Sequence, residues 1–143
     1  MKIKTKLILI LLLAMLFLAG CTADSDSVVE IGERFFFNTI TDIHINSSQY
    51  LGRTIQYEGI FWNIYWEQEY FHFAGRYVFD CCGNDGIIGF ELYLGDIEPL
   101  PDNAWVEVTG VLEEFQHNGN IFIRLSVISL VEMNERGNEF VSN

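Results

Sequence analysis

Between Arg53 and Val131 the sequence repeats one pattern, in which short runs of alternating apolar and polar residues are separated by turn-forming residues. In the first run Ile55, Tyr57 and Phe61 alternate with polar side chains, so one face of a strand is buried and the other faces water. The later runs are YFHFAGRYVFD, GIIGFELYL, WVEVTGVLEEF and IFIRLSVISLV. We therefore expect an all-β fold with five strands.

Glycines and turns within these runs indicate how the strands are joined. The dipeptide Asn118-Gly119 between two alternating runs predicts a tight hairpin. Gly75 interrupts the second run, where a bulge or sharp bend is easiest. In the last run the apolar phase shifts between Val127 and Ile128, which indicates a bulge or burial on both faces. Long, bent strands of this kind predict a five-stranded OB-like barrel, with a flat sandwich as the alternative.

The segment that precedes the barrel is too apolar for a tail. Order is expected to begin near Glu30. Alternation in ITDIHI suggests a short strand, and NSSQYLG indicates a turn into a short helical element. The expected domain is thus a single barrel over residues 30–133, with an N-terminal strand and helix extension and a polar C-terminal tail over residues 134–143.

The N-terminus has the layout of a secretory signal. Three lysines precede an uninterrupted apolar run from Leu7 to Phe17, which is short for a transmembrane helix. LAGC, ending at Cys21, resembles the lipobox of bacterial lipoproteins, in which a diacylglycerol is attached to the cysteine before cleavage. We expect residues 1–20 to be a signal peptide, Cys21 to carry the lipid, and residues 21–29 to form a flexible tether on the outer side of a bacterial cell membrane.

Charge narrows the range of partners. The signal contains all the lysines, so five arginines and 20 acidic residues remain, a formal charge of about −15. Such a chain repels phosphate backbones, which argues against nucleic-acid binding. A cation or a cationic surface on a partner suits this field better.

Three stretches, DIHINSSQYLGRTIQYEGIFW, RYVFDCCGNDGIIGFEL and WVEVTGVLEEFQHNGNIFIRLSVISL, together resemble one protein family. It is the extracytoplasmic C-terminal domain of an uncharacterised bacterial membrane-protein family, associated with predicted permeases, and its lipoprotein relatives. The most specific element is carried here by Cys81, Cys82 and Asp85. The resemblance implies an OB-type barrel, no established activity and a membrane permease as a partner. This chain lacks the membrane-spanning half of that family, which the lipid anchor would replace.

The pair Cys81 and Cys82 has three interpretations. A disulfide between neighbours would be strained, because adjacent Cα atoms lie about 3.8 Å apart, and a strained bond suits a redox switch better than a staple. If the chain turns after Cys82, both thiolates and the carboxylate of Asp85 could hold a soft transition metal, with zinc the first candidate. Alternatively, the segment is a hairpin in which the cysteines only pack.

A histidine would complete a metal site. If the strands alternate in direction, the turn after Cys82 and the turn at 116–120 lie at one end of the barrel, which makes His117 the best candidate. His44 could lie there as well, whereas His72 is about ten extended residues from Cys82, on the order of 30 Å. Each of these histidines also has an ordinary interpretation as a surface or half-buried residue.

The sequence gives little support to enzyme catalysis, since it contains no nucleophile-base constellation and no phosphate loop. Trp62, Tyr65, Trp66 and Tyr70 cluster around the first hairpin and would mark a binding surface if exposed. We therefore expect a membrane-anchored binding module that handles a soft metal. The alternative is a protein-interaction module that docks on a membrane partner through its barrel face.

Overall fold

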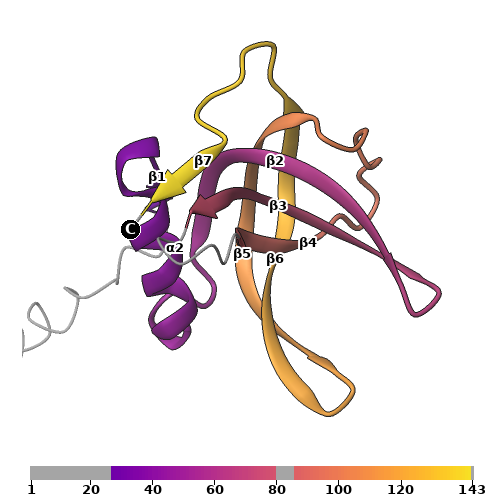
Figure 1. The fold of residues 1–143 in the computed structure, drawn as a ribbon. Coiled ribbons are helices and arrows are strands. Elements are labelled where there is room, and N and C mark those ends of the chain that lie inside the picture. Colours follow the sequence, from indigo (N-terminus) through magenta and orange to yellow (C-terminus); the bar gives the residue numbers. More distant parts are fainter. Residues whose placement is uncertain (1–26, 80–85, 143) are drawn as a thin grey trace, which may run out of the picture.

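In the computed structural model, which describes residues 27–79 and 86–142, five long strands form the body of the protein (Figure 1). They are β2 Thr54–Trp66, β3 Glu69–Phe79, β4 Gly86–Tyr93, β5 Trp105–His117 and β6 Asn120–Glu132. The number and the order of the expected strands are confirmed.

The strands close into a mixed barrel. The hydrogen-bonded order is β1-β2-β5-β6-β4-β3-β7, and an additional pairing of β2 with β3 closes the ring. Most neighbours are antiparallel, but β4 and β6 pair in parallel over Glu91–Tyr93. The OB-like barrel predicted from the sequence is therefore confirmed, and the flat sandwich is wrong.

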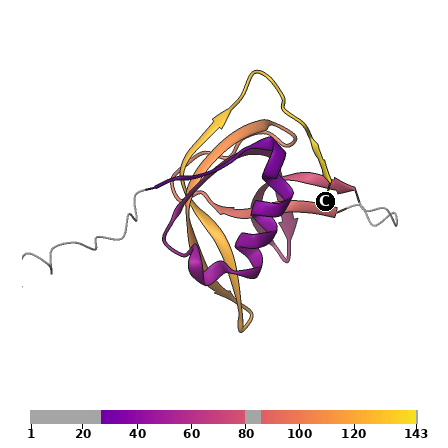
Figure 2. The same cartoon turned by 90° about the vertical axis from the view of Figure 1, so that its left-hand side faces the viewer.

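The N-terminal extension differs from the expectation. Strand β1, Val29–Ile31, pairs in parallel with β2, and the helical turn η1, Glu33–Phe35, leads into helix α2, Phe36–Ile45. The expected strand at ITDIHI is wrong, because these residues form part of α2. Helix α2 packs along one side of the barrel (Figure 2). The short helical element after it is confirmed as η2, Ser47–Gln49.

The C-terminal segment also differs from the expected polar tail. Strand β7, Phe140–Ser142, pairs in parallel with β3. Just before it, the amide of Asn138 donates to Oε1 of Glu33 over 2.8 Å, so the segment that leads into β7 is bonded to η1.

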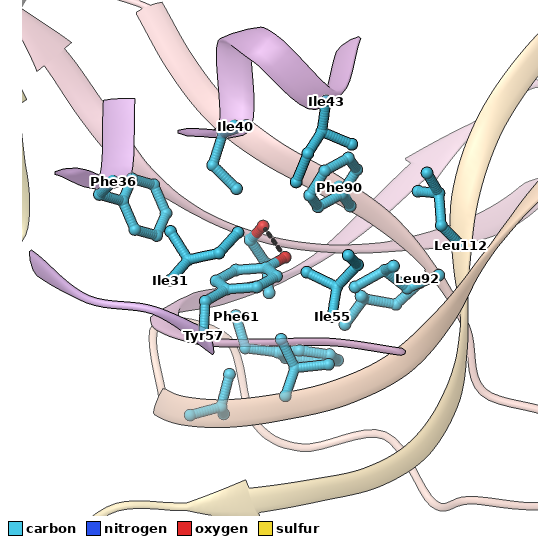
Figure 3. Close-up of a cluster of buried hydrophobic side chains, with 14 of the residues drawn as sticks. Ile31, Phe36, Ile40, Ile43, Ile55, Tyr57, Phe61, Phe90, Leu92 and Leu112 are labelled. Atoms are coloured by element: carbon cyan, nitrogen blue, oxygen red, sulfur yellow. Dashed lines mark hydrogen bonds between the residues drawn. The ribbon is translucent and has the colours of Figure 1, made fainter. Parts of the chain in front are cut away.

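The barrel interior is filled by one apolar cluster drawn from α2 and all five long strands (Figure 3). Its most buried members include Phe36, Ile40, Ile43, Ile55, Phe61, Val106, Val108, Leu112 and Leu125. Tyr57 is also inside, where its hydroxyl donates a hydrogen bond of 2.8 Å to the carbonyl oxygen of Ala74. Helix α2 thus covers one side of the barrel interior and keeps water away from the apolar cluster.

Irregularities in the strands follow the sequence in part. Thr109 pairs with Ser129, but Gly110 pairs with Val127, so Ile128 is an extra residue in β6 and confirms the predicted bulge. The register of β3 with β4 runs unbroken through Gly75, so no bulge forms there. Instead, the pairing of β3 with β2 ends at Gly75.

Two tight hairpins connect the long strands. Asn118 and Gly119 have φ angles of 49° and 81°, as the Asn-Gly signal predicts. Glu67 and Gln68 adopt the same left-handed region at the tip of the β2–β3 hairpin, without a glycine. Among the described residues, no helix has both the length and the apolar character that crossing a bilayer requires.

Candidate functional site

Most of the residues proposed from the sequence lie outside the described part of the chain. Cys21, Cys81, Cys82 and Asp85 belong to this group. Within residues 27–79 and 86–142, no three histidine, aspartate or glutamate side chains are grouped closely enough to hold a metal ion.

His117 lies at the tip of the β5–β6 hairpin, where its ring meets that of Phe71 edge-on at a centroid distance of 5.9 Å. Its Nε2 is 3.1 Å from Nδ2 of Asn118. Phe71 is near the start of β3, whereas Phe79 ends that strand, about 26 Å further along it. The described strand ends that flank Cys81 and Cys82 therefore lie away from His117, contrary to the expectation that the two turns share one end of the barrel.

The other two histidines make local contacts. His44 at the end of α2 places Nε2 2.9 Å from the carbonyl oxygen of Gly89 and stacks on Phe90. His72 places Nδ1 2.8 Å from Oδ1 of Asn63, and burial lowers its pKa. These contacts fit the ordinary interpretation of both residues.

A ladder of aromatic rings runs over the outer surface of the barrel. It consists of Trp62, Phe73, Tyr77, Phe79 and Phe140, which we call the aromatic ladder. Successive ring centroids are 6.0 Å apart for Phe73 and Trp62, 5.7 Å for Trp62 and Tyr77, 5.3 Å for Tyr77 and Phe140, and 4.8 Å for Phe140 and Phe79. The rings thus form one connected series across β2, β3 and β7.

Strand geometry explains why these rings point outward. Ala74 is fully buried in the core, so its neighbour Phe73 lies on the opposite face of β3, together with Tyr77 and Phe79. Trp62 is the partner of Phe73 in the β2–β3 register and shares that face. Phe79 and Phe140 keep 56% and 43% of their surface exposed, so the ladder is open to solvent at this end.

The β2–β3 hairpin extends beyond the barrel, away from α2 (Figure 1). It carries aromatic rings on both faces, because Trp66 lies on the face of the ladder, like Trp62, whereas Tyr65 and Tyr70 lie on the opposite face. At its tip Tyr65, Trp66 and Tyr70 are 62%, 64% and 68% exposed. The sequence left the exposure of these rings open, and the structure shows that they face solvent. Exposed aromatic clusters of this kind are typical of binding surfaces, because Trp and Tyr contribute large contact areas.

Beside the base of that hairpin an arginine is held between two rings. The guanidinium carbon of Arg124 lies 4.3 Å from the ring centroid of Tyr93 and 4.7 Å from that of Phe115. Its Nε donates a hydrogen bond of 2.8 Å to Oε1 of Glu113. Glu91, the register partner of Arg124 on β4, has a pKa raised by burial, an effect that Arg124 and His117 oppose.

On another side of the barrel, four glutamates surround a cavity of about 580 Å³. They are Glu30, Glu33, Glu58 and Glu107, contributed by β1, η1, β2 and β5. The fifth charged residue of the lining, Arg76, is buried between the rings of Phe36 and Trp105, at 4.4 and 5.0 Å from their centroids. The cavity therefore attracts cations and repels anions, in agreement with the charge of the whole chain.

Sequence reasoning missed the rings that β3 contributes to the ladder. Phe73, Tyr77 and Phe79 alternate with the inward residues of a strand, a pattern that by itself is typical of core residues. The pattern does not show which face of the strand is turned to the barrel interior. In the structure that face carries Ala74, Arg76 and Val78. The barrel face of β3 carries His72 and Arg76, whereas the more apolar face is the outer one, so the rule that the apolar face of a strand is buried assigns this strand the wrong way round.

Comparison with known protein families matches residues 18–142 to the DUF1980 C-terminal domain, whose function is uncharacterised. Comparisons with curated proteins and with solved structures gave no match. The match covers almost the whole chain, including every strand of the barrel and helix α2. The chain therefore belongs to the DUF1980 C-terminal domain family.

Proposed function

We propose that this protein is a lipid-anchored extracytoplasmic binding module that docks on a membrane protein through its aromatic ladder and the β2–β3 hairpin. The observation that carries the proposal is the connected series of rings on the outer face of β2, β3 and β7, half-buried at Trp62, Phe73 and Tyr77 and exposed at Phe79 and Phe140. Aromatic side chains bury much area at little conformational cost, so an open series of them favours a protein interface.

The anchor restricts where the partner can lie. Eight positions separate Cys21 from Val29, the first residue of β1. Even fully extended, a segment of this length reaches at most about 29 Å. A module tethered so closely to the bilayer meets membrane proteins first, which supports a permease or another membrane protein as the partner. We propose a binding role and not a catalytic one.

A second candidate function is metal handling at Cys81, Cys82 and Asp85. It is supported by the sequence, because two thiolates and a carboxylate are suitable ligands for zinc. The full chain, purified under reducing conditions, would be loaded with zinc and measured by native mass spectrometry. A stoichiometric ion that is lost in Cys81→Ser and in Cys82→Ser would support this function. A wild type that retains no zinc would exclude it, as would equal retention by the serine variants.

The anchor is tested by fractionation of the producing cells. The wild type should be in the membrane fraction and released by detergent, whereas Cys21→Ser should lose the lipid mass increment. An unmodified Cys21 in the wild-type protein would contradict the anchor.

The docking surface is tested by site-specific photocrosslinking in intact cells. A photoreactive phenylalanine analogue would replace Trp66, which is on the face of the ladder at the hairpin tip, or, as a control, Phe35, which is 61% exposed in η1. We expect position 66 to crosslink to one membrane protein, identified by mass spectrometry, and position 35 not to do so. The double variant Phe73→Ser, Phe79→Ser should abolish this product. Identical products at both positions, or none that depends on the ladder, would overturn the proposed function.

A further inference from the structure

The barrel surface already contains one arginine side chain recognised by aromatic rings. Arg124 lies between Tyr93 and Phe115, with ring centroids 4.3 and 4.7 Å from its guanidinium carbon, and Glu113 accepts its hydrogen bond. This arrangement combines two ring faces, which attract cations, with a carboxylate. It is an example, within the chain, of a cationic side chain held by aromatic rings and a carboxylate.

The aromatic ladder offers the same ring faces, and within residues 27–79 and 86–142 no arginine lies over one of its rings. Glu91 lies opposite Phe73 in the β3–β4 register, so a carboxylate borders the ladder on the same face. The chain contains no lysine after Lys6, and Arg124 is already engaged by Glu113. Two further glutamates, Glu67 and Glu69, flank the tip of the β2–β3 hairpin.

The net charge of the domain also favours a cationic partner. With about fifteen more acidic than basic residues after Cys21, the domain attracts cations and disfavours polyanions. A neutral partner would gain nothing from this field, whereas a basic partner would be steered to it.

Spacing favours an extended partner. Alternate residues on one face of a strand repeat about every 6.6 Å, both in β3 and in any extended polypeptide laid along it. Side chains on one face of such a segment therefore match the interval between Tyr77 and Phe79.

Building on the proposed docking function, we propose that the partner presents an extended polypeptide segment bearing arginine or lysine, which lies along β3 and stacks its cationic side chains on the aromatic ladder. Carboxylates at the border of the ladder, such as Glu91, would pair with these cations, as Glu113 does with Arg124.

The test uses the full chain, purified in nonionic detergent, and three synthetic peptides of about ten residues, enough to span β3. One alternates arginine and threonine, the second replaces each arginine by the uncharged isostere citrulline, and the third replaces it by glutamate. Binding is measured by isothermal titration calorimetry at two salt concentrations. We expect the arginine peptide to bind at least about tenfold more tightly than the citrulline peptide, since several cation–π contacts are lost together. The glutamate peptide should not bind.

Ladder variants separate specific stacking from general attraction. The double variant Phe73→Ser, Phe79→Ser should lower the affinity for the arginine peptide by about tenfold. Phe35→Ser should leave that affinity unchanged. Circular dichroism checks that each variant is folded, and Phe79→Ser alone serves if the double variant is not. Equal binding of the arginine and citrulline peptides would overturn the inference. So would arginine binding that is insensitive to the ladder.

Two further outcomes would also overturn it. One is ladder-dependent binding of the uncharged sugar chitohexaose without binding of the arginine peptide. The other is ladder-dependent self-association detected by ultracentrifugation. If the photocrosslink at position 66 persists while the arginine peptide fails to bind, the cationic partner is wrong and the docking function stands. If the peptide binds through the ladder but no membrane protein is crosslinked, the docking function fails alone.

Discussion

The hydroxyl of Tyr57 on β2 donates a hydrogen bond of 2.8 Å to the carbonyl oxygen of Ala74 on β3 inside the barrel (Figure 3). Both residues are buried, so water cannot replace this bond when it is removed. Replacing Tyr57 with Phe leaves the ring in place and removes only the donor. We expect the free energy of unfolding to fall by about 1 kcal/mol. Urea denaturation followed by tryptophan fluorescence measures it, and an unchanged midpoint would show that the bond is not needed.

The same phenol makes stability depend on alkaline pH. Burial raises the pKa of Tyr57 above its ordinary value of 10.0. The unfolded chain therefore releases this proton at lower pH than the folded chain. The contribution to stability is complete below about pH 10 and is lost as the pH rises above it. We expect the free energy of unfolding of the wild type to decline above about pH 10. That of the Tyr57→Phe variant should decline less steeply.

Close packing of β3 against β4 predicts a large effect of one methyl group. A Cβ at Gly89 would overlap the backbone carbonyl oxygen of Ala74 and lie 2.6 Å from Cα of Gly75. Because both obstacles are backbone atoms, they cannot rotate away. We expect Gly89→Ala to cost about 3 kcal/mol or to prevent folding.

Gly32 provides the matched control for that substitution. It has φ −76°, and a Cβ there meets no atom within 4 Å. Gly32→Ala should leave the thermal midpoint nearly unchanged. Equal midpoints of the two alanine variants would contradict the close approach of the strands.

The sequence predicts those features that local patterns determine. Five alternating runs predict five strands, Asn118-Gly119 predicts a hairpin, and the phase shift predicts the bulge at Ile128. Helix α2 was missed because the end of FFNTITDIHI alternates like a strand. Phe36, Ile40 and Ile43, its buried residues, repeat at i, i+4 and i+7, a helical spacing that was available in the sequence.

Features that depend on tertiary contacts could not be predicted in the same way. Strand β7 has three residues and exists only because β3 offers an edge beyond Gly75. The aromatic ladder depends on which face of β3 meets the core, and the face that does so carries His72 and Arg76, the reverse of what the apolar pattern predicts. The position of His117 depends on how far β5 and β6 continue past the barrel before they meet at their turn. Alternation does not limit that length.

Backbone strain at the tip of the β2–β3 hairpin predicts a stabilising substitution. Gln68 has φ 69°, in the left-handed region, where a side chain costs about 1 kcal/mol relative to glycine. Glycine also gives the unfolded chain more conformational freedom, which offsets part of this gain. Gln68→Gly should therefore raise the free energy of unfolding by about 0.5 kcal/mol. Gln116→Gly, in the regular strand β5, should lower it. Differential scanning calorimetry compares the two, and two shifts of equal sign would show that the turn is not strained.

Arg76 is the most deeply buried charged residue in the described part of the chain. Its Nε donates to the carbonyl oxygen of Glu58 over 2.9 Å, and its guanidinium lies between the rings of Phe36 and Trp105. Arg76→Ala leaves a cavity between two rings and should cost about 3 kcal/mol. Arg76→Met keeps most of the volume and avoids burying a charge, so its cost should be about 1 kcal/mol.

Denaturant titrations of these two variants, with Arg34→Ala as an exposed control, separate packing from charge at Arg76. Arg34 is in η1 and exposed, so its removal should change the unfolding free energy by less than about 0.5 kcal/mol. If Met restores most of the stability that Ala loses, the side chain acts mainly by filling the space where β3 separates from β2. If Met costs as much as Ala, the ion pair of Arg76 with Glu33, at 3.6 Å, and the hydrogen bond to Glu58 hold this part of the barrel together instead.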